Sequence, residues 1–366
     1  METGSDRVLP KHTSKDVAIA NLGYVEGRMN GTITSLRTKF PRFNANTMDG
    51  IERNTIVTIS APSGGGKSTL AKELINSVHE MNPLIPMNIY NFNFEMTNDQ
   101  AASREIVTKA DISLKKLYSV GNDKLQKEEF ERLKKNYYAE MAKRDNYFYI
   151  EVPADPSVII NSMWSYYINE CKPHGKMIIT CLDHTLLIKN KQSQSDRQKI
   201  DELMNMLIEF KKTVKEDGGS SMTLVLSQMN RDIYSKERIL NPTMHRPKTS
   251  DLFGASSIEF ASDLILFAHA PGKLNLPAYT ENNYPTWFDW NGRQFFMIYF
   301  ELVKNRSGEA PVTIPMLNML HRFRMEEMDL TKFNEMCTEF RDSGACSYRE
   351  DLFGNDLMQV INGTTS

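Results

Sequence analysis

A lysine and a serine that directly follow three glycines are the residues of this chain best suited to phosphate chemistry. The glycines let the backbone curl so that successive N–H groups point into one hollow, and a helix that starts there adds its positive dipole end. Lys67 would reach the β- and γ-phosphates of a nucleotide, and the Ser68 hydroxyl would ligate Mg²⁺. The spacing therefore predicts that ATP and Mg²⁺ are held by Ser63, Gly64, Gly65, Gly66, Lys67, Ser68 and Thr69.

The phosphate-loop pattern is complete except at one position. A glycine usually stands six residues before the lysine, and this chain has Ala61 there. A glycine-rich turn can also be a plain tight turn. The β-branched run before it and the helical spacing of Leu70, Leu74 and Val78 after it favour the phosphate loop, because that loop joins a strand to a helix.

Two acidic residues follow apolar or aromatic runs that we expect to be strands. Glu95 comes just before Thr97 and Gln100, which form a capping box, so a helix should begin beyond it. It would then lie at the carboxyl end of a strand, where open α/β sheets bind their ligands. Asp183 ends the run K-M-I-I-T-C-L-D and is placed to hold Mg²⁺ through water. The alternative interpretations are that Glu95 is simply an acidic residue before a helix cap and that Asp183 is an ordinary turn residue.

Strands and helices must alternate to position these side chains. Residue patterns predict helices over 14–29, from the glycine turn to 81, over 156–171 and after 196, with surface helices between 113 and 144. They predict strands at 55–60, 88–94, 147–152, 176–182, 222–227, 264–267, 295–303 and 312–317. This alternation indicates an α/β fold, a P-loop NTPase core whose mostly parallel central sheet is flanked by helices, with a C-terminal antiparallel hairpin.

Basic residues gather in three polar segments. Lys304 and Arg306 lie near the tip of the predicted hairpin, and the other two segments are loops over 189–196 and 231–248. By residue type alone, such charges are solvated surface groups. The aromatic segment over 279–290 is better explained as a packed flap than as a base-stacking platform, because prolines and acids interrupt it.

Composition excludes several classes of protein. The chain has 366 residues, 25% of them charged, and a formal net charge of −2. It has no overall basic field that would indicate a nucleic-acid partner, and its net charge does not exclude one. Its apolar runs fall far short of the ~18 residues of a membrane span, and the N-terminus lacks an apolar signal core. We therefore expect no membrane partner and a cytoplasmic protein. The four cysteines have no CxxC spacing, which argues against a disulfide framework or a zinc site.

Six motifs in a fixed order narrow the assignment. They are F-E-M, L-D-H-T-L-L-I, S-D-R-Q-K-I, L-S-Q-M-N-R, S-D-L-F-G-A-S-S-I-E-F-A-S-D-L-I-L-F and V-K-N-R-S-G. Together they resemble the RecA-like motor domain of the DnaB family of replicative helicases, including its phage members. The resemblance covers residues 34–324, so we expect an arm or linker helix over 1–33, the motor domain over 34–324 and a tail over 325–366.

The resemblance implies a role for each matching residue. Glu95 resembles the general base that activates the attacking water, and Gln228 the sensor of the γ-phosphate. Lys304 and Arg306 resemble basic fingers that one subunit extends into the site of its neighbour. The two polar loops would line the pore of a ring and grip single-stranded DNA. The candidates for DNA contact are Lys189, Lys191, Arg197, Arg231, Lys236 and Arg238.

The family further implies a homo-oligomer, a hexameric ring that moves 5′ to 3′ on single-stranded DNA and unwinds duplex. We expect a phage-type member without the helical N-terminal domain that recruits primase in cellular members, so primase and a loader are partners that the sequence does not establish. His184 replaces a usual aromatic residue, and F-G-A after Leu252 replaces the common R-E-S. The alternative hypothesis is an ATP-gated scaffold on single-stranded DNA, recombinase-like or a loader, that does not unwind processively.

Overall fold

The computed structural model describes residues 10–183, 188–189, 194–290, 293–320 and 323–343. The strands in this part of the chain are β1 (Thr55–Ala61), β2 (Met87–Asn93), β3 (Tyr147–Ile150), β4 (Met177–Asp183), β5 (Ser221–Gln228), β6 (Leu264–His269), β7 (Trp287–Trp290), β8 (Arg293–Phe296), β9 (Ile298–Asn305), β10 (Val312–Met319) and β11 (Arg324–Glu327). The helices are α1 (Ser14–Met29), α2 (Pro41–Asn46), α3 (Lys67–Met81), α4 (Asn98–Ala110), α5 (Leu114–Tyr118), α6 (Lys127–Leu133), α7 (Ala139–Ala142), α8 (Pro156–Tyr166), α9 (Asp196–Glu216), α10 (Lys236–Leu240), α11 (Ala255–Ala261) and α12 (Leu330–Asp342).

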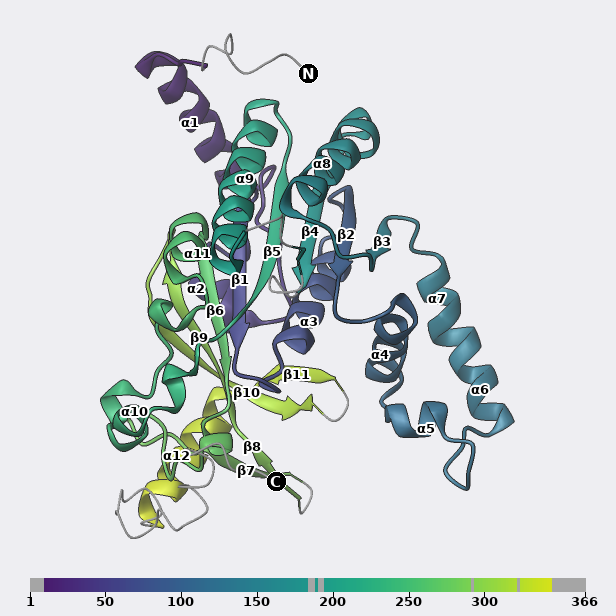
Figure 1. The fold of residues 1–366 in the computed structure, drawn as a ribbon, viewed down its shortest axis with the longest axis vertical. Coiled ribbons are helices and arrows are strands. Elements are labelled where there is room, and N and C mark those ends of the chain that lie inside the picture. The colour runs from purple at the N-terminus through teal and green to yellow at the C-terminus, as the bar shows by residue number, and fades with distance from the viewer. Residues whose placement is uncertain (1–9, 184–187, 190–193, 291–292, 321–322, 344–366) are drawn as a thin grey trace.

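One sheet organises the molecule. In the described residues its nine strands follow the order β11-β10-β9-β6-β1-β5-β4-β2-β3 (Figure 1). The run from β6 to β3 is parallel, whereas β9, β10 and β11 are antiparallel additions beside β6. The predicted α/β fold with a mostly parallel sheet and an antiparallel C-terminal part is confirmed.

Helices cover both faces of the sheet because its central strands are apolar on both sides. On one face, α2 and α3 pack on side chains such as Val57, Ile59 and Leu224. On the other face, α8, α9 and α11 pack on side chains such as Ile56 and Val225. Alternate residues of one strand thus serve two separate cores. Helices α4 to α7 lie beyond the β3 edge, apart from these layers (Figure 1).

A third apolar cluster joins segments that follow the parallel strands. It contains Ile233 and Ile239 from the segment after β5, Tyr279 and Phe288 from the segment between β6 and β9, and Phe333 from α12. Tyr279 and Phe288 of the aromatic segment are therefore packed, as expected for a flap, whereas Trp287 is exposed. The segment over 231–248 is not the solvated loop that its charges indicated, because its two isoleucines are buried in this cluster.

Local signals located most elements well, with three differences. The helix predicted over 14–29 is α1, and the Thr97 capping box starts α4. The strand predicted over 295–303 is divided into β8 and β9. The sheet also extends past residue 324 through β11, and α12 packs into the third cluster, so the folded body includes part of the expected tail. Within the described residues, no helix has the length and apolar character needed to cross a membrane.

Candidate functional site

The turn between β1 and α3 has the backbone that its glycines predict. Gly64 and Gly66 have φ angles of 66° and 91°, in the left-handed region. A Cβ at Gly66 would lie 2.2 Å from Cε of Met325, the end of a flexible side chain that can move, so it is the left-handed backbone conformation that disfavours a side chain there. Ala61 is the last residue of β1 and has no positive φ. Alanine therefore fits the position where the usual pattern has glycine.

Strand register brings the predicted polar residues to this turn. Ala61 is paired with Gln228 across β1 and β5, and Asn93 is paired with Asp183 across β2 and β4. Because these strands are parallel, their carboxyl ends meet at one edge of the sheet. One cavity there is lined by the whole turn from residue 61 to 69, by Glu95 and by Gln228.

Asp183 has the surroundings of a cation ligand. Its side chain is buried, it lines one pocket together with Ser68, and its Oδ1 atom is buried with no hydrogen-bond partner. Burial raises the pKa of Asp183 to about 6, with Lys67 opposing the change, and burial lowers the pKa of Lys67. A buried carboxylate oxygen without a partner, beside a serine hydroxyl, fits the oxygen donor set that Mg²⁺ prefers.

Lys304 and Arg306 are far from that edge. Asn305 is paired with Leu264, the first residue of β6, which runs parallel to β1. Both basic residues therefore lie near the amino ends of the parallel strands, whereas the glycine turn follows the carboxyl end of β1. The structure does not bring them to the nucleotide cavity of their own chain.

Comparisons with known proteins identify the family of the chain. A family model described as "DnaB-like helicase C terminal domain" matches residues 35–325. The chain belongs to the DnaB-like helicase C-terminal domain family. It is an α/β ATPase domain of the RecA-like kind, and the family implies binding and hydrolysis of a nucleoside triphosphate. A search of curated protein sequences found no match.

Solved structures share the DnaB-like fold. The ATPase domain of a phage helicase superposes with a TM-score of 0.67 at 19% identity, covering 87% of this chain and 100% of that one. A structure titled as a DnaB-like replicative helicase and its interactions with primase gives a TM-score of 0.66 at 18% identity, covering 87% of this chain and 69% of that one. At these identities the likeness establishes the fold.

The predicted DNA-contact residues of this DnaB-like chain fall into different environments. Lys189 and Arg197 are exposed, and Lys191 lies outside the described residues. Arg231 and Lys236 are exposed and line the same cavity as the glycine turn. The five therefore remain candidates, with Lys191 resting on sequence alone.

Arg238 is a correction to the sequence prediction. Its side chain is buried, its Nη1 atom lies 2.5 Å from Oδ1 of Asp251, and its other nitrogens donate to the carbonyl oxygens of Met244 and Arg246. A buried, fully engaged guanidinium cannot grip DNA without breaking these bonds. Arg238 instead holds the 231–248 segment together, and Asp251, in the motif that departs from the family pattern, is its partner.

Sequence reasoning missed residues that lie around the nucleotide cavity. Arg104 of α4 lines it, and its guanidinium carbon lies 5.0 Å from the ring centre of Phe323, which also lines it. Lys273 donates from Nζ to the carbonyl oxygen of Gly64 at 2.6 Å. No local motif marks these three residues, because their nearness to the turn depends on helix and strand packing.

Proposed function

We propose that this chain is the motor of a DnaB-like replicative helicase, which hydrolyses ATP to translocate on single-stranded DNA and unwind duplex. We propose a ring of identical subunits, a hexamer, with 5′ to 3′ movement. One observation carries the proposal. The nucleotide cavity lies at the carboxyl ends of the parallel strands, and the basic pair Lys304 and Arg306 lies near their amino ends. In this proposal a complete site therefore requires two copies of the chain.

Several residues at and beside the cavity have parts in the proposed hydrolysis. The N–H groups of the glycine turn and the Lys67 ammonium would bind the phosphates, and Ser68 and Asp183 would hold Mg²⁺. The bound cation would offset negative charge on the phosphate oxygens. Glu95 accepts a proton from the attacking water, a task suited to an exposed carboxylate that lines the cavity.

Gln228 is placed to report the state of the γ-phosphate. It ends β5 beside Ala61, and its carbonyl oxygen accepts a hydrogen bond from the Phe253 N–H at 3.0 Å. Asn230 in turn donates its N–H to the Asp251 carbonyl oxygen at 2.7 Å. Loss of the γ-phosphate at Gln228 would thus act on a segment whose buried anchor is the pair of Arg238 and Asp251.

The proposed DNA contacts are the exposed cations Lys189, Lys191, Arg197, Arg231 and Lys236, with Lys191 placed by sequence alone. Phosphate gripping needs few cations per subunit when several copies surround one strand, which is compatible with the net charge of −2. A primase or a loader is a proposed partner, since one structure with this fold is titled for its interactions with primase.

The test combines two assays on the full chain. ATP hydrolysis is measured with and without single-stranded DNA, and strand separation is measured on forks carrying only a 5′ or only a 3′ tail. The proposal predicts DNA-stimulated hydrolysis and unwinding of the 5′-tailed substrate. Stimulated hydrolysis without strand separation would favour the ATP-gated scaffold, and no hydrolysis under any DNA condition would end both hypotheses. Negative-stain images with ATP and DNA distinguish a ring from a filament.

A further inference from the structure

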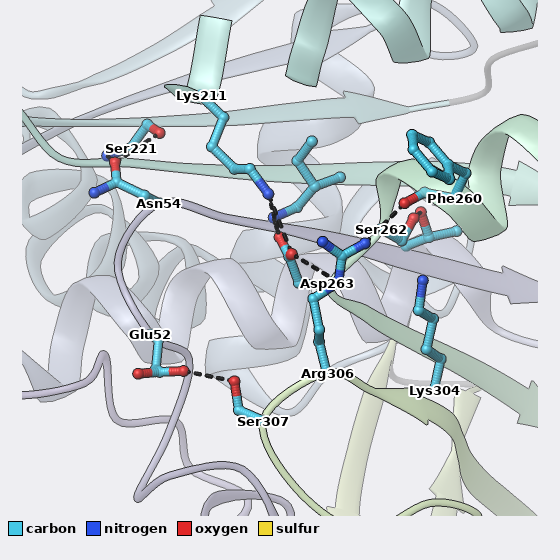
Figure 2. A network of polar contacts seen from close by, with 12 residues as sticks. Glu52, Asn54, Lys211, Ser221, Phe260, Ser262, Asp263, Lys304, Arg306 and Ser307 are labelled. Atoms are coloured by element: carbon cyan, nitrogen blue, oxygen red, sulfur yellow. Dashed lines mark hydrogen bonds and ion pairs between the residues drawn. The ribbon is translucent and has the colours of Figure 1, made fainter. Parts of the chain in front are cut away.

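We propose that Asp263 is a positioning residue that holds Arg306 at the subunit surface, ready for the site of a neighbouring copy, and that Lys211 fixes Asp263 for this purpose. The inference deepens the proposed function and rests on it. Asp263 belongs to the motif A-S-D-L-I-L-F, to which the proposed chemistry gives no role. Figure 2 shows Lys211 and Arg306 approaching the Asp263 carboxylate from opposite sides.

Asp263, in the loop between α11 and β6, contacts three other parts of the fold. Its Oδ2 atom accepts a hydrogen bond from the N–H of Ile56 in β1 at 2.8 Å. Its two carboxylate oxygens lie 3.1 and 2.8 Å from Nζ of Lys211 on α9. Its backbone carbonyl oxygen accepts a bond from the Arg306 N–H at 2.9 Å, and its Oδ1 atom lies 3.5 Å from Nε of Arg306. The residue therefore fixes both the backbone and the side chain of Arg306.

The two ion pairs of Asp263 differ in strength. The side chains of Lys211 and Asp263 are each 15% exposed, whereas that of Arg306 is 53% exposed. A pair shielded from water is held more firmly than one at the surface, provided that its remaining hydrogen bonds are satisfied. Asp263 is therefore a fixed anchor, and Arg306 is held loosely enough to exchange this carboxylate for a phosphate with more negative charge.

The rest of the guanidinium is held by the end of a helix. Nη2 of Arg306 donates to the Phe260 carbonyl oxygen at 2.8 Å, and Nζ of Lys304 donates to the Glu259 carbonyl oxygen. These oxygens belong to the last turn of α11 (Ala255–Ala261), whose carbonyl groups carry partial negative charge. Without a neighbour, both cations thus occupy the same helix end and point the same way (Figure 2).

The turn beyond Arg306 is also anchored. Ser307, the residue after Arg306, donates its hydroxyl to Oε2 of Glu52 at 2.8 Å. Figure 2 shows this contact away from the Asp263 carboxylate. The backbone of Arg306 is therefore fixed on both sides, while its side chain retains an exposed path outward. This arrangement fixes the backbone of Arg306 while its side chain stays partly exposed.

The first test is Asp263→Asn. The asparagine keeps an acceptor for the Ile56 N–H but removes the charge that faces Arg306 and Lys211. We expect kcat for ATP hydrolysis to fall roughly 10-fold. The KM for ATP should stay within about 2-fold of the wild-type value, since the nucleotide cavity of the same subunit lies at the opposite ends of the parallel strands. Lys212→Gln, on the exposed face of α9 next to Lys211, is the matched control and should keep wild-type kcat. An unchanged kcat in Asp263→Asn would overturn the inference.

The second test separates positioning from general damage. Asp263→Asn protein is mixed with Lys67→Ala protein, which lacks a working phosphate loop but has an intact Asp263 and Arg306. In a 1:1 mixture about a quarter of the interfaces join an intact phosphate loop to an intact finger. We expect hydrolysis above the sum of the two separate proteins. Absence of this rescue would overturn the inference, because a finger defect must be repairable by a neighbour.

The proposed function can fail independently. If pure Arg306→Ala protein hydrolyses ATP at the wild-type rate, the finger assignment itself is wrong. If Arg306→Ala is inactive while Asp263→Asn is fully active, the finger stands and the positioning role of Asp263 is wrong.

Discussion

Lys67 and Arg306 lie at opposite ends of the parallel strands of one sheet. Lys67 begins α3 just after the carboxyl end of β1, whereas Arg306 follows β9, which ends beside the first residue of β6. A sheet strand is too rigid for these two side chains to meet within one subunit. These two residues could therefore act on one nucleotide only if they come from two copies of the chain, as the proposed ring requires, and this relationship motivates the first prediction.

Arg306→Ala should abolish turnover without abolishing nucleotide binding. Removing a finger that stabilises transition-state charge lowers kcat about 1,000-fold in related chemistry. A fluorescent ATP analogue should still bind the variant within about 3-fold of the wild-type affinity, since the phosphate loop is intact. Arg132→Ala, at an exposed site on α6, is the control and should be normal in both assays. Undiminished turnover by pure Arg306→Ala would remove this residue from the site.

Glu95→Gln should separate binding from hydrolysis in another way. The amide keeps the size of the side chain but cannot accept a proton from water, so we expect kcat to fall at least about 100-fold. Because Glu95 is exposed at the cavity and not part of the core, the melting temperature should not change. Steady-state ATPase assays and circular dichroism check the two expectations. A variant with more than a tenth of the wild-type kcat would contradict a role as general base.

Asp183→Asn should stabilise the nucleotide-free protein above pH 6 while abolishing Mg²⁺-dependent hydrolysis. Burial raises the pKa of Asp183 to about 6, from an ordinary value near 3.9. The neutral carboxyl therefore favours the folded state below pH 4, and this contribution is lost as the pH rises to about 6. An asparagine is neutral at every pH, so the variant should gain up to about 3 kcal/mol at pH 8.

Denaturation in EDTA at pH 8 and pH 4 measures this gain. The difference between variant and wild type should be largest at pH 8 and almost vanish at pH 4, and comparing the two proteins removes the contributions of other titrating groups. Wild-type protein should also lose Mg²⁺-ATP affinity as the pH falls below about 6, because protonated Asp183 cannot hold the cation. A variant less stable than wild type at pH 8 would contradict the assigned burial.

Gly66→Ala should disrupt the nucleotide site by straining the backbone of the glycine turn. The added Cβ would lie 2.2 Å from the Met325 side chain and 2.9 Å from that of Leu320, and alanine is strained at a φ of 91°. We expect a loss of about 1 to 3 kcal/mol in folding free energy and no measurable binding of an ATP analogue. Gly121→Ala is the control, since its Cβ would meet only the Ser119 hydroxyl at 3.9 Å. Normal nucleotide binding by Gly66→Ala would show that the turn is not the phosphate site.

Arg231, Lys236 and Arg238 should behave differently although they lie close together in the sequence. Arg231→Ala and Lys236→Ala remove exposed charges and should weaken single-stranded DNA binding and flatten its dependence on salt, with no change in melting temperature. Arg238→Ala leaves Asp251 buried without its partner and should cost about 3 to 5 kcal/mol of stability. Fluorescence anisotropy at several salt concentrations, with denaturation of each variant, separates the two effects. Equal melting temperatures for all three would contradict the buried ion pair.

Sequence alone determined the features that depend on residues close together in the chain. Three glycines followed by Lys67 and Ser68 predicted the turn, because only glycine readily adopts the left-handed angles found at Gly64 and Gly66. The capping box at Thr97 predicted the start of α4 to the residue. The alternation of apolar strands with amphipathic helices predicted the α/β fold, since each pattern is suited to one kind of burial.

Tertiary structure alone decided which residues meet. Arg104 and Lys273 reach the glycine turn through packing that no local spacing encodes, and Arg238 is buried against Asp251 although the nearby cations Arg231 and Lys236 are exposed. Asp263 and Arg306 are likewise joined only because β9 pairs antiparallel with β6. The physical reason is that charge and residue type do not determine burial. Burial depends on strand order and register, which arise from contacts between segments far apart in the chain.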